Sequence, residues 1–338
     1  MSTSRFAIEA REAATGARRQ LEVAASALAE LDTRLRARPP SLVVTCGRGS
    51  SDHATTYGKY LLETTVGRVV ASVGPSVASL YNRTLALDGA LFVSVSQSGR
   101  SPDVLRTTEA ARRGGALVVG LVNDQASPLV QLCDVVIPLC AGDEHSVPAT
   151  KSFLLACLGF LQLAACWSGD PVLRDAVAQA PDALDAACAL DWDLGSLASA
   201  TSVYVVGRGL GLGAAFELAL KLKETCRLHA EAFSAAELAH GPIALVERGF
   251  PAIVLGQPDE TERTTRELAA RLVALGASVR STLDVDGAQH LPTVPDVPSV
   301  LSPLCQVQSF YLAIPALAAS RGLDPNAPPY LEKATQTI

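Results

Sequence analysis

The alternation of apolar runs and polar turns along the chain predicts repeated strand–turn–helix units. Short apolar runs rich in β-branched residues at 42–46, 91–97 and 116–122 are typical of buried strands. The turn after residue 97 leads into a helical pattern at 102–113 and then into the strand at 116–122. Strand, turn, helix and strand at this spacing form parallel βαβ units with right-handed crossovers.

The same pattern recurs 160 residues later. The strand at 42–46 is followed by Gly47-Arg48-Gly49, and a strand at 203–206 is followed by Gly207-Arg208-Gly209. A second pair of strands ends in Gln97 and in Gln257, at the same offset. Two landmarks at one offset indicate an internal duplication, and therefore two parallel-sheet domains in tandem.

The fold class predicted is α/β, with two doubly wound parallel-sheet domains in three αβα layers and an N-terminal helix. Pro39-Pro40 ends the helical pattern of the first residues. We expect an N-terminal helix over 1–40, a first domain over 41–170, a helical linker over 171–198, a second domain over 199–322, and a C-terminal tail over 323–338 that closes the site.

The charge and hydropathy of the chain argue against two classes of partner, nucleic acids and membranes. The formal net charge is −6 and basic residues form no cluster, which argues against a nucleic-acid partner. The apolar run Phe153–Trp167 is shorter than the ~20 residues that a membrane span needs, so we expect a buried helix and no membrane. None of the eight cysteines has Cys-x-x-Cys spacing, which indicates buried structural thiols and no disulfide framework.

Two serine-rich loops are candidate anion-binding sites. Gly47-Arg48-Gly49-Ser50-Ser51 follows one strand, and Ser96-Gln97-Ser98-Gly99-Arg100-Ser101 follows the next and precedes a helix that opens with Pro102. Short hydroxyls and free N–H groups at a helix amino end are donors that a phosphate needs. The alternative is a pair of ordinary serine and glycine turns with a helix cap. Neither loop has a nucleotide-binding motif.

Charged side chains on an otherwise apolar helix form a second candidate. Lys221 and Glu224 lie one turn apart in the stretch 216–228, which is apolar almost all round. A carboxylate in such a place is a suitable base for a proton beside a carbonyl group, and the alternative is a surface ion pair. His240 lies in a sharp turn, where its ring is either functional or an ordinary loop histidine.

Several segments together resemble the sugar isomerase (SIS) domain family. The resemblance is to the isomerase half of glutamine–fructose-6-phosphate aminotransferase and to glucosamine-6-phosphate deaminases that lack a glutaminase domain. The segments that carry it, in family order, are Ser96–Gly99, Ala141–Lys151, Ala219–Glu224, His229–Ala232, Glu237–Pro242 and Asp324–Lys333.

The resemblance implies a role for each candidate residue. Glu224 is implied as the base that moves a proton between C1 and C2, with Lys221 close by. His240 is implied in ring opening at the neighbouring subunit's site, and Lys333 in contact with the open-chain sugar. The residues implied in binding the phosphate and nearby groups are Ser50, Ser51, Ser96, Gln97, Ser98, Ser101 and Val147.

The implied activity is that of an amino-sugar-phosphate deaminase acting as an aldose–ketose isomerase. It would convert glucosamine 6-phosphate, or a related hexosamine phosphate, to fructose 6-phosphate and ammonia with no cofactor and no metal. We expect a cytoplasmic homodimer with a shared active site. The absent glutaminase domain argues against glutamine-dependent amination, and Pro148 removes one backbone N–H from the family pattern. A fructosamine-type deglycase of sugar-amine phosphates and a non-catalytic sugar-phosphate-binding regulator remain alternatives.

Overall fold

The computed structural model describes residues 4–333, and its contacts divide the chain into two compact units. We name them the β1–β5 unit and the β6–β10 unit after their sheets. The β1–β5 unit comprises the described residues of 12–144, 151–181 and 332–338. The β6–β10 unit comprises the described residues of 1–11, 145–150 and 182–331. Each unit is described by itself.

The β1–β5 unit contains one parallel five-stranded sheet in the order β2-β1-β3-β4-β5. Its strands are β1 (Leu42–Cys46), β2 (Val70–Ser72), β3 (Ala90–Ser96), β4 (Leu117–Val122) and β5 (Val135–Pro138). Its helices are α2 (Ala13–Val23), α3 (Ala25–Ala37), α4 (Ser50–Thr65), α5 (Ser76–Ser79), α6 (Pro102–Arg113) and α7 (Lys151–Ser168), with a 3₁₀ turn η1 (Pro128–Leu132).

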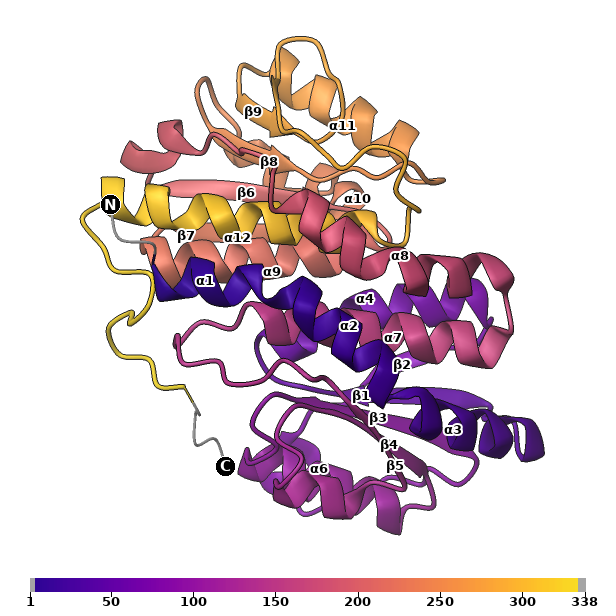
Figure 1. Cartoon of the computed structure of the whole chain (residues 1–338). Coiled ribbons are helices and arrows are strands. Elements are labelled where there is room, and N and C mark those ends of the chain that lie inside the picture. Colours follow the sequence, from indigo (N-terminus) through magenta and orange to yellow (C-terminus); the bar gives the residue numbers. More distant parts are fainter. Residues whose placement is uncertain (1–3, 334–338) are drawn as a thin grey trace. The chain divides into compact units, whose positions relative to one another are not determined.

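Helices cover both faces of this sheet because its central strands are apolar on both sides. All seven residues of β3 are buried. Phe92 and Val118 form one side of the core together with Val104 and Ala111 of α6. On the opposite face α4 contacts β1 and β3 and packs in turn on α7 (Figure 1). Burial on both faces is the usual reason for such continuous β-branched runs.

The β6–β10 unit contains a second parallel sheet in the order β10-β9-β8-β6-β7. Its strands are β6 (Ser202–Gly207), β7 (His229–Ser234), β8 (Pro251–Val254), β9 (Ser278–Ser281) and β10 (Gln289–His290). Its helices are α1 (Arg5–Arg11), α9 (Gly211–Cys226), α10 (Ala235–Ala239), α11 (Glu262–Ala274) and α12 (Ser302–Ser320), with 3₁₀ turns η2 (Gly195–Ser199) and η3 (Pro242–Leu245).

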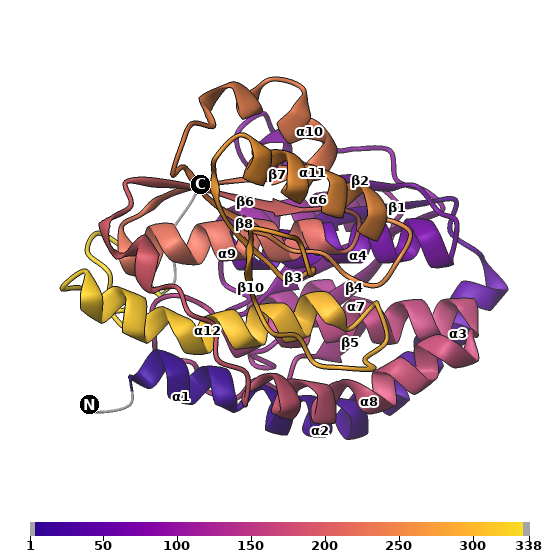
Figure 2. The same ribbon diagram turned by 90° about the horizontal axis from the view of Figure 1, so that it is seen from above.

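Two helices of this unit, α9 and α12, run side by side (Figure 2). The helix α9 also contacts β6 and β7, while α10 and α11 bury apolar residues in the core of the opposite face. The rings of Phe6 on α1 and Tyr311 on α12 pack edge to face, with centroids 5.7 Å apart.

The two sheets have the same topology, which confirms the predicted α/β fold with two doubly wound parallel sheets. In each sheet the first strand lies between the second and the third, and the fourth and fifth follow. The order reverses between β1 and β3 in one sheet and between β6 and β8 in the other. Ligands in such folds bind at the carboxyl ends of the strands near this switch point.

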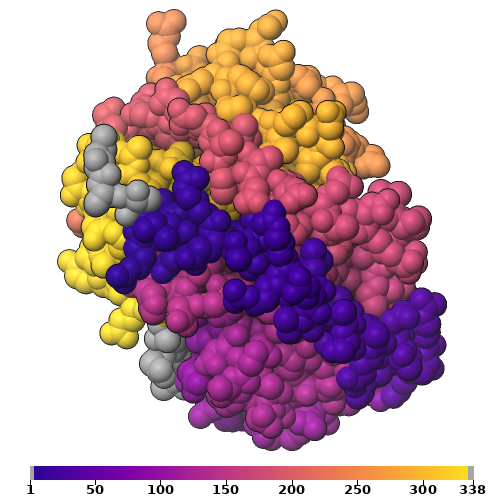
Figure 3. Space-filling model, in the orientation of Figure 1, coloured from indigo at the N-terminus to yellow at the C-terminus, as the bar shows by residue number. Residues whose placement is uncertain are grey.

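The predicted N-terminal helix consists of three consecutive helices, α1, α2 and α3. They are separated at Glu12 and Ala24, which have ψ angles of −6° and −10° instead of the helical value near −42°. The backbone bonds from Gly16 to Glu12 and from Leu28 to Ala24 continue the helical ladder across both positions. Helices α2 and α3 keep an exposed face, which is seen in indigo in Figure 3.

The apolar run near residue 160 is the buried helix α7, as predicted. By length and composition α7 is able to cross a membrane, but 83% of it is buried within the protein, as in core helices of soluble proteins. The following helix α8 (Pro171–Ala187) falls in the predicted linker and ends well before residue 198.

Candidate functional site

The two serine-rich loops emerge at the same edge of the β1–β5 sheet. Strands β1 and β3 are parallel neighbours, with Cys46 opposite Ser94, so their carboxyl ends meet. The helix α4 begins at Ser50, within the last two residues of the first loop, and α6 begins at Pro102 directly after the second loop. The amino ends of two helices therefore lie at the carboxyl ends of these strands, together with the serine hydroxyls, and the helix dipoles favour an anion there.

The second loop owes its shape to a glycine and two serines. Gly99 has φ +61°, and a Cβ there would lie 2.1 Å from Oγ of Ser127, so no larger residue is tolerated. The amide of Gly99 donates to Oγ of Ser96 at 2.9 Å, and the amide of Arg100 donates to Oγ of Ser98 at 3.3 Å. Each serine oxygen thus accepts one bond within the loop and keeps its own hydrogen to donate.

The first loop also depends on close backbone approach. A Cβ at Gly47 would lie 2.9 Å from the amide nitrogen of Asp52, and Gly49 at the start of α4 has φ +54°. The guanidinium of Arg48 bonds the fully buried carboxylate of Asp103 in the first turn of α6 at 2.7 Å. This ion pair links the two loops, and the partnership of Arg48 with Asp103 was not predicted from the sequence.

The predicted pair on α9 is part of a larger buried cluster. The ammonium of Lys221 lies 2.6 Å from Oε2 of Glu224 and 3.3 Å from Oε1 of Glu217. Burial lowers the pKa of Lys221, but the two carboxylates outweigh burial and raise that pKa above its ordinary value. Lys221 is therefore a permanent cation at neutral pH.

Two members of this cluster were missed as site residues. Glu217 is fully buried, and it accepts a 2.8 Å hydrogen bond from the hydroxyl of Tyr311 on α12. Glu224 differs from Glu217 because 19% of its side chain is exposed. The spacing of Glu217 and Lys221 by one turn was a signal for the first residue, whereas nothing in the sequence pointed to Tyr311.

His240 is an exposed residue at the end of α10. Its amide bonds the carbonyl of Glu237 at 3.0 Å, and its side chain lies at the surface of the β6–β10 unit. The structure gives His240 no contact with Lys221 or Glu224 among the interactions of the described residues.

Lys333 and Val147 have partners of their own. The ammonium of Lys333 lies 3.0 Å from Oε2 of Glu144, a buried carboxylate that also accepts the amide and hydroxyl of Ser152. The amide of Val147 donates to the carbonyl of Asn326 at 3.0 Å, so it is already used in the fold.

The predicted site residues thus fall into two sets, one in each unit. The β1–β5 unit holds the serine-rich loops and Lys333, and the β6–β10 unit holds Lys221, Glu224, His240 and Val147. The structure brings the loops together at one strand edge and brings Lys221 into contact with Glu224.

The eight cysteines are free thiols, as predicted, but only four of them are buried and the other four are half-buried. Burial raises the pKa of Cys46 and of Cys305 to about 12. A thiol with such a pKa stays protonated at neutral pH and is a poor nucleophile.

Comparison with protein families gives one match over most of the chain. The model of the SIS domain matches residues 40–166 and 196–283. A glutamine–fructose-6-phosphate aminotransferase (isomerizing) of Aeropyrum pernix is 35% identical over 308 residues, which are 85% of this chain and 50% of that protein. The corresponding protein of Symbiobacterium thermophilum is 33% identical over 347 residues, with 96% and 55% coverage. The chain therefore spans about half the length of these relatives.

Solved structures give the same picture. A candidate phosphosugar isomerase from Silicibacter pomeroyi is 42% identical with a TM-score of 0.90, over 96% of this chain and all of that one. Glucosamine-6-phosphate deaminase from Thermotoga maritima is 21% identical with a TM-score of 0.79, covering 99% of this chain and 100% of that one. At this identity the second likeness concerns the fold alone.

Proposed function

Because the chain belongs to the SIS domain family, we propose that it converts an amino-sugar phosphate to a ketose phosphate and ammonia. Glucosamine 6-phosphate is the proposed substrate, and fructose 6-phosphate the proposed product. The relatives, which are about twice as long as this chain, are named as glutamine–fructose-6-phosphate aminotransferases. The observation that carries the proposal is the ion pair between Lys221 and Glu224. The ammonium of Lys221 is buried, whereas the carboxylate of Glu224 is partly exposed.

In the proposed reaction the serine-rich loops hold the phosphate group. Ser50, Ser51, Ser98 and Ser101 are half-buried at the carboxyl ends of β1 and β3, where hydroxyls and helix amino ends supply donors. Ser96 is more deeply buried and also shapes its loop. Gln97 is assigned to the same group of binding residues.

The proposed chemistry proceeds from the open-chain amino aldose. Glu224 removes the proton from C2, and the electrons of the broken C–H bond form a double bond between C2 and C1. The carbonyl oxygen at C1 takes up the proton that the substrate's ammonium group releases, which gives an enolamine. Return of the proton to C1 gives an imine at C2. Water then adds to the imine and ammonia leaves, so that one water is consumed and one ammonia is released. Lys221 orients Glu224 and stabilises its charged form.

Ring opening and sugar contact are assigned to the remaining residues. His240 is proposed to open the ring in the site of a second copy of the chain, and its surface exposure supports such a role. Lys333 is proposed to contact the open-chain sugar after it leaves Glu144, and Val147 to lie beside the bound substrate. The chain would then act as a homodimer, and its eight free thiols support a cytoplasmic location.

The test is an assay of ammonia release from a panel of hexosamine 6-phosphates, run in parallel in heavy water. We expect ammonia and deuterium at C1 from glucosamine 6-phosphate. Greater ammonia or amine release from a fructosamine phosphate would favour the deglycase alternative. Tight binding of the panel with neither ammonia nor deuterium exchange would contradict both enzymatic proposals and favour a regulator.

A further inference from the structure

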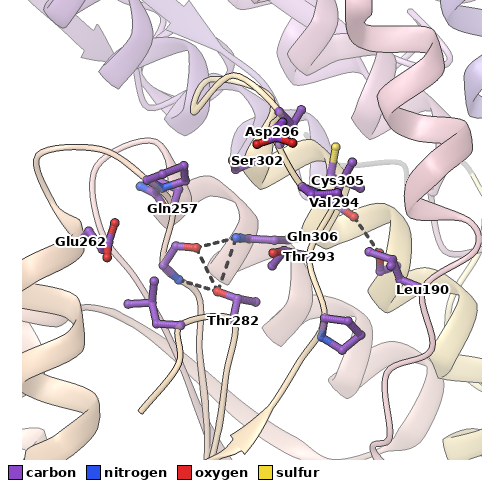
Figure 4. A pocket seen from close by; sticks show the side chains of 17 residues that line it. Leu190, Gln257, Glu262, Thr282, Thr293, Val294, Asp296, Ser302, Cys305 and Gln306 are labelled. Carbon is purple, nitrogen blue, oxygen red and sulfur yellow. Dashed lines mark hydrogen bonds between the residues drawn. The ribbon is translucent and has the colours of Figure 1, made fainter.

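A cavity in the β6–β10 unit is lined by none of the residues assigned to catalysis. It has a volume of about 340 Å³, and it is lined by residues that follow β8, β9 and β10 and by the start of α12 (Figure 4). Gln257 at its wall is the counterpart of Gln97 in the duplicated pattern. The cavity therefore lies at the strand edge where folds of this topology bind ligands, and its size is in the range of small-molecule sites.

The charge of this cavity differs from that of the serine-rich loops. Its seventeen lining residues, all in the described chain, include the carboxylates of Glu262 and Asp296 and no lysine, arginine or histidine. Glu262 also pairs with Arg266, which lies outside the lining, at 2.7 Å. The cavity borders the amino ends of α11 and α12, which favour anions, but Glu262 already supplies a negative charge at the first of them. The lining therefore holds no cationic side chain that would balance a phosphate group.

Gln306 is a buried polar residue of the lining whose bonding is incomplete. Its amide nitrogen donates to the carbonyl of Gly256 at 2.6 Å, which fixes the side chain at the wall. Its Oε1 has no hydrogen-bond partner among the described residues, although the residue is only 3% exposed. A buried carbonyl oxygen in this state calls for a donor from water or from a ligand. Gln257 is in the same state: its amide nitrogen donates to the carbonyl of Arg208 at 2.8 Å, and its buried Oε1 has no hydrogen-bond partner among the described residues.

Apolar side chains complete the lining. Leu190, Leu283, Val294 and Val297 supply carbon surface, and Ser302 at the start of α12 supplies a hydroxyl. The lining thus combines apolar side chains with hydrogen-bond acceptors and carboxylates. This combination suits a small molecule that has an apolar face and also carries hydroxyl or ammonium groups as hydrogen-bond donors.

We propose that this cavity is a second ligand site for an unphosphorylated amino sugar, whose ammonium pairs with Glu262 and whose hydroxyl donates toward Gln306. The proposal does not rest on the proposed deaminase activity, because it concerns residues outside the serine-rich loops and the α9 cluster. The two halves of the duplicated fold would then bind different ligands, one phosphorylated and one cationic.

The test is calorimetric titration of the full chain with glucosamine, glucose and inorganic phosphate. Glu262→Gln removes one carboxylate, and Glu260→Gln is its matched control because Glu260 is exposed on the same turn and does not line the cavity. Val294→Trp fills the cavity from a loop position. Ser98→Ala weakens the other site.

We expect saturable binding of glucosamine that is tighter than that of glucose. Loss of a charge-assisted hydrogen bond in Glu262→Gln should weaken it about tenfold or more, while Glu260→Gln and Ser98→Ala leave it unchanged. Phosphate binding should weaken in Ser98→Ala and persist in Val294→Trp.

Three results would overturn the proposal. The first is that glucosamine shows no saturable binding. The second is that wild type and Val294→Trp bind glucosamine with equal affinity, and the third is that Val294→Trp abolishes the binding of phosphate. Equal affinity for glucose and glucosamine would overturn the assignment of the ammonium. Because Glu262 is at the surface, Glu262→Gln provides the test even if Val294→Trp does not fold. Ammonia release from glucosamine 6-phosphate is measured separately, so failure of one proposal is distinguishable from failure of the other.

Discussion

The hydroxyl of Tyr311 on α12 donates a 2.8 Å hydrogen bond to the buried carboxylate of Glu217 on α9. The same carboxylate lies 3.3 Å from the ammonium of Lys221, which lies 2.6 Å from Glu224. Glu217 is therefore satisfied by two partners within the fold. It also holds the ammonium of Lys221 in place, and Glu224 is the carboxylate of this cluster whose side chain is partly exposed.

Replacing Glu224 with glutamine should abolish most of the activity and leave the binding of phosphate esters nearly unchanged. The amide keeps the shape of the side chain but accepts no carbon-bound proton, so the turnover rate should fall about 10²–10⁴-fold. Steady-state assays of ammonia release and titration with glucose 6-phosphate measure the two effects. Glu231→Gln, an exposed change on β7, is the control. An active Glu224→Gln enzyme would remove Glu224 from the proposed mechanism.

Replacing Lys221 with methionine should destabilise the protein strongly. The change leaves the carboxylate of Glu217 buried beside an apolar side chain, and breaking a buried ion pair in this way costs about 3–5 kcal/mol. Urea denaturation measures the loss, and the double variant Glu217→Gln/Lys221→Met should recover part of it. A loss below about 1 kcal/mol would mean that the cluster contributes little to stability.

The effect of Lys221 should also depend on pH. The raised pKa of Lys221 in the folded state means that its contribution to stability is complete below the unfolded pKa of ~10.4. The contribution is lost as pH rises through the folded pKa. The stability difference between wild type and Lys221→Met should therefore stay constant up to about pH 10 and shrink above it.

Replacing Ser98 with alanine should weaken phosphate binding without unfolding the protein. Loss of one hydrogen bond to a charged group costs about 1.5–3 kcal/mol of binding free energy. Ser96→Ala should add a loss of loop order, because Ser96 also accepts the amide of Gly99. Titration with inorganic phosphate is the measurement, and Ser41→Ala, an exposed change at the opposite edge of the sheet, is the control. Unchanged affinity in both loop variants would contradict the phosphate assignment.

The buried thiols should make the protein less stable at alkaline pH. Burial raises the pKa of Cys46 and Cys305 to about 12, whereas unfolded thiols have a pKa of ~8.5. Between these values the folded state holds protons that the unfolded state has lost, so the free energy of unfolding falls as pH rises. Urea denaturation at several pH values tests this, and Cys305→Ala should show a smaller slope. Rapid alkylation of native Cys46 or Cys305 would contradict their burial.

Mixing two inactive variants should restore activity if the active site is shared between copies. His240→Ala and Glu224→Gln each lack one proposed group, and hybrid dimers would contain one site with both. Ammonia release after mixing and re-equilibration measures the recovery. A fully active monomer in sedimentation would exclude the shared site.

Much of the fold was predictable because it depends on local signals. The β-branched runs at 42–46 and 91–97 are β1 and β3 almost residue for residue, since strands buried on both faces need continuous apolar side chains. Gly49 and Gly99 have positive φ, which explains why glycine stands in both serine-rich loops. The sequence repeat at an offset of 160 residues corresponds to two sheets whose strands follow the same order.

By itself, the sequence determined the α/β class, the duplication and the positions of the loops. These features depend on hydrophobic periodicity and on turn residues, which act between residues that are close together in the chain. The tertiary structure alone decided which distant side chains meet. Tyr311 reaches Glu217 across 94 positions, and Arg48 reaches Asp103 across 55. The cavity beside Gln306 likewise collects residues from 190 to 309. Such contacts depend on how helices pack on a sheet, and no local pattern encodes that packing.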